Sequence, residues 1–140
     1  HNMYEYIIEY FASRGHRCIA IDLRGYGNSD KPYTGYDYDR MAMDIKLVID
    51  ALKLSDITLV GHSMGGAICL RYMSKFNEDK VSRLCLLSAV APKWVQSSNW
   101  LYGYTVDEVN KLIDSFKSDK PKAIIDTSES FFINLLVKVY

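Results

Sequence analysis

The sequence lacks three features that would point to a polyanionic or membrane partner. Lys plus Arg equals Asp plus Glu at 17 each, so no excess of positive charge attracts nucleic acid or an anionic membrane. No apolar run reaches the roughly 20 residues that a membrane-spanning helix requires. No basic segment followed by an apolar one opens the chain, so we see no export signal. We therefore expect a cytoplasmic protein that binds neither nucleic acid nor a membrane.

Cysteine pairs and cofactor motifs are also missing. The three cysteines, Cys18, Cys69 and Cys85, are odd in number and far apart, which argues against a disulfide framework or a zinc site. Each lies in an apolar segment, so we expect small buried side chains in a reducing compartment rather than a nucleophile. The Gly-Tyr-Gly sequence at 25–27 lacks the third glycine of a dinucleotide-binding loop, because Asp30 stands there. The sequence thus predicts no metal and no cofactor.

Apolar periodicity divides the first 90 residues into alternating helices and strands. The helices are predicted at residues 3–13, 41–52 and 64–76, and the strands at residues 18–22, 57–61 and 81–87. Asp37 or Asp39 can cap the second helix. This alternation is typical of an α/β fold with a parallel sheet and helices on both faces. The carboxyl ends of the strands should then gather Asp22, Ser63 and Ser88 on one side, where ligands bind in such sheets.

The character of the sequence changes after residue 90. Aromatic side chains without a clear period come first, followed by Thr105 and Glu108 in the spacing of a capping box with an apolar helical face behind it. Asp119 before Pro121 predicts a further helix start. We therefore divide the chain into a core portion at residues 1–90 and a helical cap or lid at residues 91–140.

The Gly-x-Ser-x-Gly motif at residues 61–65 carries the candidate chemistry. It follows a predicted strand and precedes a predicted helix, which is the context of a nucleophile elbow. In so tight a turn Ser63 takes strained backbone angles with a positive φ, and glycines on both sides leave room for neighbouring backbone. A second glycine at 66 allows close packing of the helix. The strain lifts the hydroxyl out of the sheet, and the N–H of Met64 at the helix start can stabilise an oxyanion. The alternative is a tight turn in which Ser63 merely caps the helix.

Three segments together resemble the α/β-hydrolase family, in its branch of esterases, haloperoxidase-like enzymes and carbon–carbon-bond hydrolases. The Asp-Leu-Arg-Gly-Tyr-Gly-Asn-Ser-Asp-Lys-Pro sequence at 22–32 resembles the loop after the family's fourth strand. Residues 60–66, Val-Gly-His-Ser-Met-Gly-Gly, resemble its elbow, and residues 84–89, Leu-Cys-Leu-Leu-Ser-Ala, resemble its sixth strand. The resemblance covers residues 1–90, whereas residues 91–140 resemble only the general idea of a helical cap inserted after that strand.

This resemblance implies nucleophilic chemistry at Ser63. Related dehalogenases and epoxide hydrolases have Asp at the elbow, whereas a Ser favours acyl transfer through a covalent ester. We therefore expect a serine hydrolase that acts on a small, apolar ester, lactone or related carbonyl substrate through an acyl-enzyme. An acyltransferase or carbon–carbon-bond hydrolase of the same fold, and a ligand-binding protein without turnover, stay open as alternatives.

The other candidate residues have weaker signals. His62 adjoins the nucleophile, but successive residues of a tight turn point apart, so we expect a pocket wall or packing rather than the catalytic base. His16 lies at the start of a predicted strand and is expected to be structural, and Asp22 resembles a structural carboxylate near the rim of the family's active site. Trp94 and Trp100 are candidates for an apolar acyl pocket, with packing inside the cap as the alternative.

The resemblance also implies that further segments of the same protein complete this chain. In the family the triad His and acid follow the cap, and the second oxyanion N–H lies just upstream of residue 1. A further strand of the family lies between the strands predicted at 18–22 and 57–61. Without that strand, buried backbone groups on both sides would be unpaired, at a cost of about 1–3 kcal/mol each. We therefore expect flanking segments to complete both the sheet and the site.

Overall fold

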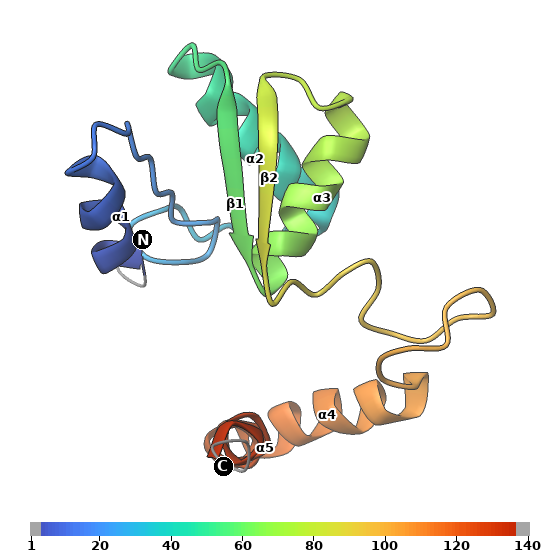
Figure 1. The fold of residues 1–140 in the computed structure, drawn as a ribbon. Helices are drawn as coiled ribbons and strands as arrows, with labels where there is room; N and C mark the ends of the chain where they lie inside the picture. The colour runs from blue at the N-terminus through green and yellow to red at the C-terminus, as the bar shows by residue number, and fades with distance from the viewer. Residues whose placement is uncertain (1–3, 137–140) are drawn as a thin grey trace. The chain divides into compact units, whose positions relative to one another are not determined.

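The computed structural model describes the backbone of residues 4–136 and the side chains of residues 4–128, in two compact units, residues 1–91 and residues 92–140. The first unit contains α1 (Glu5–Ala12), α2 (Tyr38–Ala51), β1 (Ile57–His62), α3 (Met64–Phe76) and β2 (Val81–Leu87). The second contains α4 (Val106–Ser118) and α5 (Lys120–Leu136) (Figure 1). Within residues 4–136 no helix is long and apolar enough to cross a membrane.

The strands β1 and β2 form a parallel sheet, as the sequence predicts, and α3 is the connection between them. Their register places His62, the last residue of β1, opposite Leu87, the last residue of β2. Both strands therefore end at the same level. Ser63 and Ser88 follow them at the same edge of the sheet, which confirms that part of the expected gathering.

The strand predicted at residues 18–22 is not formed in the described part of the chain. There β1 pairs with β2 alone, and residues 16–23 belong to no sheet. An apolar run becomes a strand only when a neighbouring strand pairs with its N–H and C=O groups. The run still packs inward, because Ile21 and Leu23 contact the core. The predicted place of Asp22 at the end of a sheet strand is wrong for the same reason.

The helices α2 and α3 pack together against one face of the sheet (Figure 1). The six buried residues of this core are Met41, Ala42, Ile45, Ile49, Ile68 and Tyr72. Spacings of four residues put the α2 members on one side of that helix, and Ile57, Leu59 and Val81 of the strands pack against them. In contrast, α1 buries no residue. The described helices thus cover one of the two faces that we expected to be covered, and Val60 on the other is half exposed.

Charged side chains fix the start of α2. Of the two candidate caps, Asp37 is the one used, and its carboxylate accepts a hydrogen bond from the Arg40 backbone N–H at 2.8 Å. Asp39 instead reaches α3, where it pairs with Arg71 at 2.7 Å and with Lys75 at 3.1 Å. Their hydrogen bonds, first that of Arg71, lower the pKa of the Asp39 carboxyl to about 2.

The second unit contains the two helix starts that the sequence predicts. The Thr105 hydroxyl accepts a hydrogen bond from the Glu108 N–H at 3.2 Å, and the Glu108 carboxylate accepts one from the Thr105 N–H at 2.7 Å. Asp119 accepts from the Lys122 N–H at 3.0 Å at the start of α5. Residue 3 of the first predicted helix lies outside the described residues, as do residues 137–140 of the predicted cap portion.

Candidate active site

Ser63 occupies the turn between β1 and α3 with φ 51° and ψ −123°. The predicted positive φ is confirmed. Backbone angles of this kind cost a non-glycine residue of order 1–3 kcal/mol and persist only where the surroundings enforce them. The turn therefore stores strain at the residue that the motif identifies as the candidate nucleophile.

Two glycines make room for this turn. A Cβ at Gly61 would lie 2.6 Å from the Gly65 carbonyl oxygen and 2.7 Å from the Cys69 sulfur. A Cβ at Gly66 would lie 2.3 Å from the Cβ of Ala89, at the end of β2. A Cβ at Gly65 would meet nothing within 4 Å among the described residues, so the need for glycine there stays a prediction. The crowded pair is thus 61 and 66 rather than the 61 and 65 of the motif.

The hydroxyl of Ser63 makes no hydrogen bond to the described residues. A serine that only capped α3 would accept from a backbone N–H of the first turn, and Ser63 makes no such bond. Its main-chain oxygen, not its side chain, accepts from the Gly66 N–H at 3.0 Å. The helix-cap alternative is therefore wrong for this side chain, which is half-buried and has no partner in the described chain.

The backbone N–H of Met64 is also unpaired within the described residues. Met64 is the first residue of α3, and the first N–H groups of a helix have no partner inside it. The positive end of the helix dipole lies at the same place. An N–H so placed next to the Ser63 hydroxyl suits an oxyanion that forms when the hydroxyl attacks a carbonyl.

The end of β2 holds the main chain of Ser63 from both sides. The Ser63 N–H donates to the Leu87 oxygen at 3.0 Å, and the Ser63 oxygen accepts from the Val90 N–H, also at 3.0 Å. Ser88, between these two bonds, has a φ of 43°. The sequence pattern did not predict these two hydrogen bonds. The available signal was the pair of small residues, Ser88 and Ala89, directly after a predicted strand.

The two described histidines have separate places. His62 is the last residue of β1 and is exposed, and no hydrogen bond joins its imidazole to a described residue. His16 packs edge-to-face against the Phe11 ring with centroids 5.6 Å apart, which agrees with the expected structural role. Within the described residues neither imidazole is bonded to Ser63, so the residue that would activate the hydroxyl is not among them.

Asp22 organises the loop that follows it. Its carboxylate accepts a hydrogen bond from the Asn28 backbone N–H at 3.0 Å, and that bond lowers the pKa of the carboxyl. The Ser29 hydroxyl donates to the Asp22 main-chain oxygen at 2.6 Å. Arg24 then ties the loop to α2 through Nε and a terminal nitrogen, 2.5 and 2.7 Å from the Asp44 carboxylate. These contacts agree with the structural role that we expected for Asp22.

Cys69 lies directly beneath the elbow and is inert there. Burial raises the pKa of its thiol to about 11, so it is protonated at neutral pH and a poor nucleophile. Cys18 and Cys85 are half-buried and, like Cys69, unbridged. Tyr4 lies near the same spot: burial raises the pKa of its phenol, and it lies beside Cys69 and the His62 backbone. No motif in the sequence indicates this position of Tyr4.

The two tryptophans belong to an aromatic turn of the second unit. Trp94 contacts Tyr104 edge-on with centroids 5.1 Å apart, and Trp100 contacts Tyr102 in the same way at 5.2 Å. The Trp94 side chain is half exposed, and the Trp100 indole N–H is buried without a hydrogen-bond partner in the described chain. Their role in substrate binding stays a prediction.

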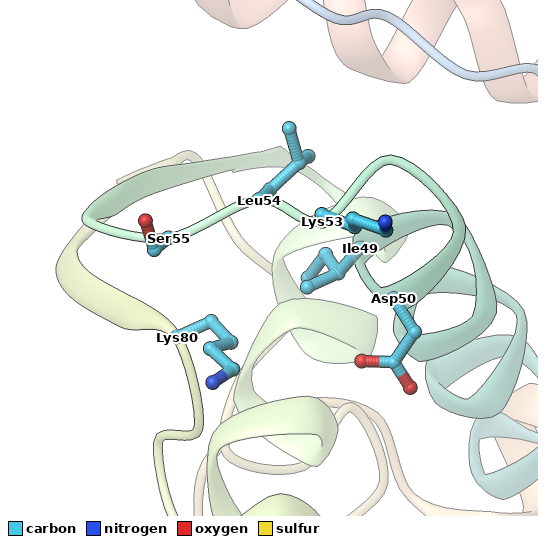
Figure 2. Close-up of a pocket in the computed structure, with 6 residues that line it drawn as sticks. All are labelled: Ile49, Asp50, Lys53, Leu54, Ser55 and Lys80. Carbon is cyan, nitrogen blue, oxygen red and sulfur yellow. The ribbon is translucent and has the colours of Figure 1, made fainter.

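A depression of about 310 Å³ lies at the other end of the sheet (Figure 2). Its lining residues are Ile49, Asp50, Lys53, Leu54, Ser55 and Lys80. They come from the end of α2 and from the turns before β1 and β2, whereas Ser63 follows the last residue of β1. Among the described residues no group of three or more His, Cys, Asp or Glu side chains is arranged to hold a metal ion. The candidate site is therefore the elbow, not this depression.

Known proteins are similar to this chain over most of its length. The model of a protein family described as alpha/beta hydrolase fold matches residues 1–137. The AB hydrolase superfamily protein YisY of Bacillus subtilis (strain 168) is 46% identical over 132 residues, which are 94% of this chain and 49% of that protein. A non-heme chloroperoxidase of Streptomyces lividans is 33% identical over 123 residues, which are 88% of this chain and 45% of that protein.

A solved structure agrees with the sequence relatives. The esterase EaEST from Exiguobacterium antarcticum superposes with a TM-score of 0.85 at 47% identity, over 91% of this chain and 48% of that one. The chain spans about half the length of the curated relatives described above. Because the family model matches nearly every residue, the chain belongs to the alpha/beta hydrolase fold family.

Proposed function

We propose that the protein is a serine hydrolase in which Ser63 attacks the carbonyl carbon of a small, apolar ester, lactone or related substrate. One observation carries the proposal. The Ser63 hydroxyl lies on a strained turn, has no hydrogen-bond partner in the described chain, and is followed by the unpaired N–H of Met64. A hydroxyl with a purely structural role would be bonded to its helix or to a neighbour, because an unpaired polar group costs free energy.

The reaction follows from these two groups. A general base takes the Ser63 proton as Oγ bonds to the carbonyl carbon, and the carbonyl oxygen becomes an oxyanion that accepts from the Met64 N–H. When the oxyanion collapses, the bond to the alcohol oxygen breaks and the alcohol takes the proton. Water, deprotonated by the same base, then attacks the acyl-enzyme and releases the acid and free Ser63.

The proposal also requires a general base that takes the Ser63 proton. His62 is at the exposed end of β1, and no described side chain is bonded to the Ser63 hydroxyl. We infer that the triad His, its acid and a second oxyanion N–H come from segments of the protein outside these 140 residues. The name of the 47%-identical structure, an esterase, supports ester hydrolysis as the reaction.

The test uses the full-length protein and two serine variants. Ser63→Ala should lower kcat/KM for a short-chain ester by at least about a thousandfold, because the covalent route is lost. It should also abolish labelling by a serine-directed phosphonate while the thermal midpoint stays near that of the parent. Ser74→Ala, an exposed serine on the same helix, is the matched control and should keep full activity.

Two results would overturn the proposal. Residual turnover of Ser63→Ala within tenfold of the parent would place the nucleophile elsewhere. A well-folded parent that forms no phosphonate adduct would favour a ligand-binding protein without turnover. Product analysis in the presence of an added alcohol distinguishes hydrolysis from acyl transfer to an acceptor other than water.

A further inference from the structure

The strained turn at Ser63 is held from the side by a short segment, Leu87–Val90, which we call the clamp. Its first residue accepts a hydrogen bond from the Ser63 N–H, and its last donates one to the Ser63 oxygen, both at 3.0 Å. Only Ser88 and Ala89 lie between these two bonds. The N–H and the C=O of Ser63 are thus both hydrogen-bonded to one four-residue segment, which begins at the last residue of β2.

The clamp also contacts the first turn of α3. An added Cβ at Gly66 would lie 2.3 Å from the Ala89 Cβ, 3.1 Å from the Ala89 Cα and 3.3 Å from the Gly61 oxygen. The Ala89 methyl group therefore lies against the Gly66 backbone with no space between them for a further carbon. The Gly66 N–H in turn donates to the Ser63 oxygen, so that oxygen receives bonds from the helix and from the clamp.

Ser88 shows that this segment does not follow a relaxed path. Its φ of 43° lies in the left-handed region, which is unfavourable for a residue with a side chain. The elbow and the clamp are thus strained at neighbouring positions of the same sheet edge, and two hydrogen bonds join them. A strained conformation persists only when its surroundings over-determine it, and here each segment supplies part of the surroundings of the other.

We propose that Ala89 is a positioning residue, whose methyl group, by its contact with Gly66, fixes the first turn of α3 and hence the Met64 N–H relative to the Ser63 hydroxyl. In this proposal Ala89 acts through its contact with Gly66. This inference rests on the proposed function, because it concerns the geometry of the same nucleophile and oxyanion donor. Displacements of about 1 Å at such sites can cost on the order of a hundredfold in rate.

A steric exchange between the two residues tests the proposal in the full-length protein. Gly66→Ala introduces a methyl group into occupied space and should lower kcat for a short-chain ester about tenfold or more, with KM within about twofold of the parent. Ala89→Gly alone removes the contact and should lower kcat a few-fold. The double variant moves the methyl group from one side of the contact to the other. It should recover a clear part of the activity that Gly66→Ala loses, because the 2.3 Å contact is removed while those of 3.1 Å and 3.3 Å remain.

The role of Ala89 is tested by kcat per folded, reactive enzyme molecule, so the amount of such enzyme is measured first. Thermal midpoints and the number of phosphonate-reactive sites are measured for all four proteins, so that kcat is expressed per competent site. Rescue by the double variant supports the proposal. Lower thermal midpoints with unchanged kcat per site, or losses in the double variant that merely add, would overturn it and leave Ala89 with packing alone. If Gly66→Ala does not fold, the kcat of Ala89→Gly per site decides in the same way.

This experiment separates the inference from the function on which it depends. If the parent forms no adduct at Ser63, the proposed function fails and no statement about positioning remains. If the parent reacts normally and the exchange variants show no coupling in kcat, only the role of Ala89 fails.

Discussion

The two ends of the β1–β2 sheet both hold non-glycine residues at positive φ, yet only one end has the features of a reaction site. At the carboxyl end these residues are Ser63 and Ser88. At the amino end they are Lys53, Asp56, Asn77, Glu78 and Lys80, with φ between 51° and 64°. The two ends differ in the backbone conformation that goes with the positive φ. Asn77, with ψ 49°, simply ends α3 in the left-handed helical region, whereas the ψ of −123° at Ser63 lies outside that region.

The two ends of the sheet also differ in whether their polar side chains have partners. At the amino end Lys46 pairs with both Asp50 and Asp79 at 2.7 and 3.2 Å, and the Tyr72 hydroxyl donates to the Asp79 oxygen at 2.7 Å. At the carboxyl end the Ser63 hydroxyl has no partner in the described chain. A positive φ therefore marks helix ends and turns in general. A candidate site needs, in addition, polar groups that the fold leaves unpaired.

The largest expected effect comes from relieving the strain at one residue of each end. Ser63→Gly should abolish ester hydrolysis and raise the free energy of unfolding by about 1 kcal/mol, the strain relieved less the extra chain entropy of glycine. Asn77→Gly should change stability by less, because its φ of 51° and ψ of 49° lie in the ordinary left-handed region, and it should leave hydrolysis intact. Urea unfolding and ester hydrolysis measure both. A Ser63→Gly protein that is less stable than the parent would contradict the assignment of strain to the elbow.

A smaller effect is expected from the buried tyrosine at the amino end. The Tyr72 side chain is fully buried, and its hydroxyl donates to the main-chain oxygen of Asp79. Tyr72→Phe removes this hydrogen bond. The free energy of unfolding should fall by about 1 kcal/mol, since a part-buried hydrogen bond is lost. Phosphonate labelling of Ser63 should keep its parental rate. A change in labelling would mean that the two ends are coupled through α3, and the comparison between them would then fail.

The smallest effect concerns the ion pairs that join α2 to α3. Arg71 and Lys75 hold the pKa of Asp39 at about 2, below the usual value of about 3.9. A carboxyl with a lowered pKa in the folded state adds stability at pH values above about 4, and this is lost as the pH falls through about 2. Asp39→Asn should thus be slightly less stable than the parent at pH 7, with the difference shrinking below pH 4.

Urea midpoints at several pH values measure this effect, and Asp114→Asn, an exposed carboxylate on α4, is the matched control. Because the Asp39 pairs are exposed to solvent, the difference should be small and should decrease with added salt. A difference that grows below pH 4 would contradict the assigned direction of the pKa shift.

The sequence was sufficient to predict the elements whose formation depends on local pattern. The periodicity of α2 and α3, the Asp37 cap and the capping box at Thr105 all follow from spacings of three or four residues. The strained turn with positive φ at Ser63 follows from a strand, a motif and a helix in direct succession. Each of these features depends on residues that are neighbours in the chain.

Features that depend on lateral neighbours could not be predicted in this way. Residues 18–22 have the composition of a buried strand, but a strand also requires a partner, and composition carries no information about that partner. The close packing at Gly66 was predicted from the second glycine after the motif, but its partner Ala89 was not, because that residue comes from the segment after β2. The small residues Ser88 and Ala89 were a signal for the clamp, but they did not predict its hydrogen bonds to Ser63, because main-chain groups make those bonds.

The backbone of the elbow also gives a built-in label for hydrogen exchange. Two consecutive amides, those of Ser63 and Met64, have opposite surroundings: the first donates to the Leu87 oxygen at 3.0 Å, and the second has no acceptor in the described chain. Deuterium should therefore enter at Met64 much faster than at Ser63, one peptide bond away. A bound oxyanion or phosphonate would slow exchange at Met64 alone. The Met64 amide would thus report occupancy of the site without any added probe.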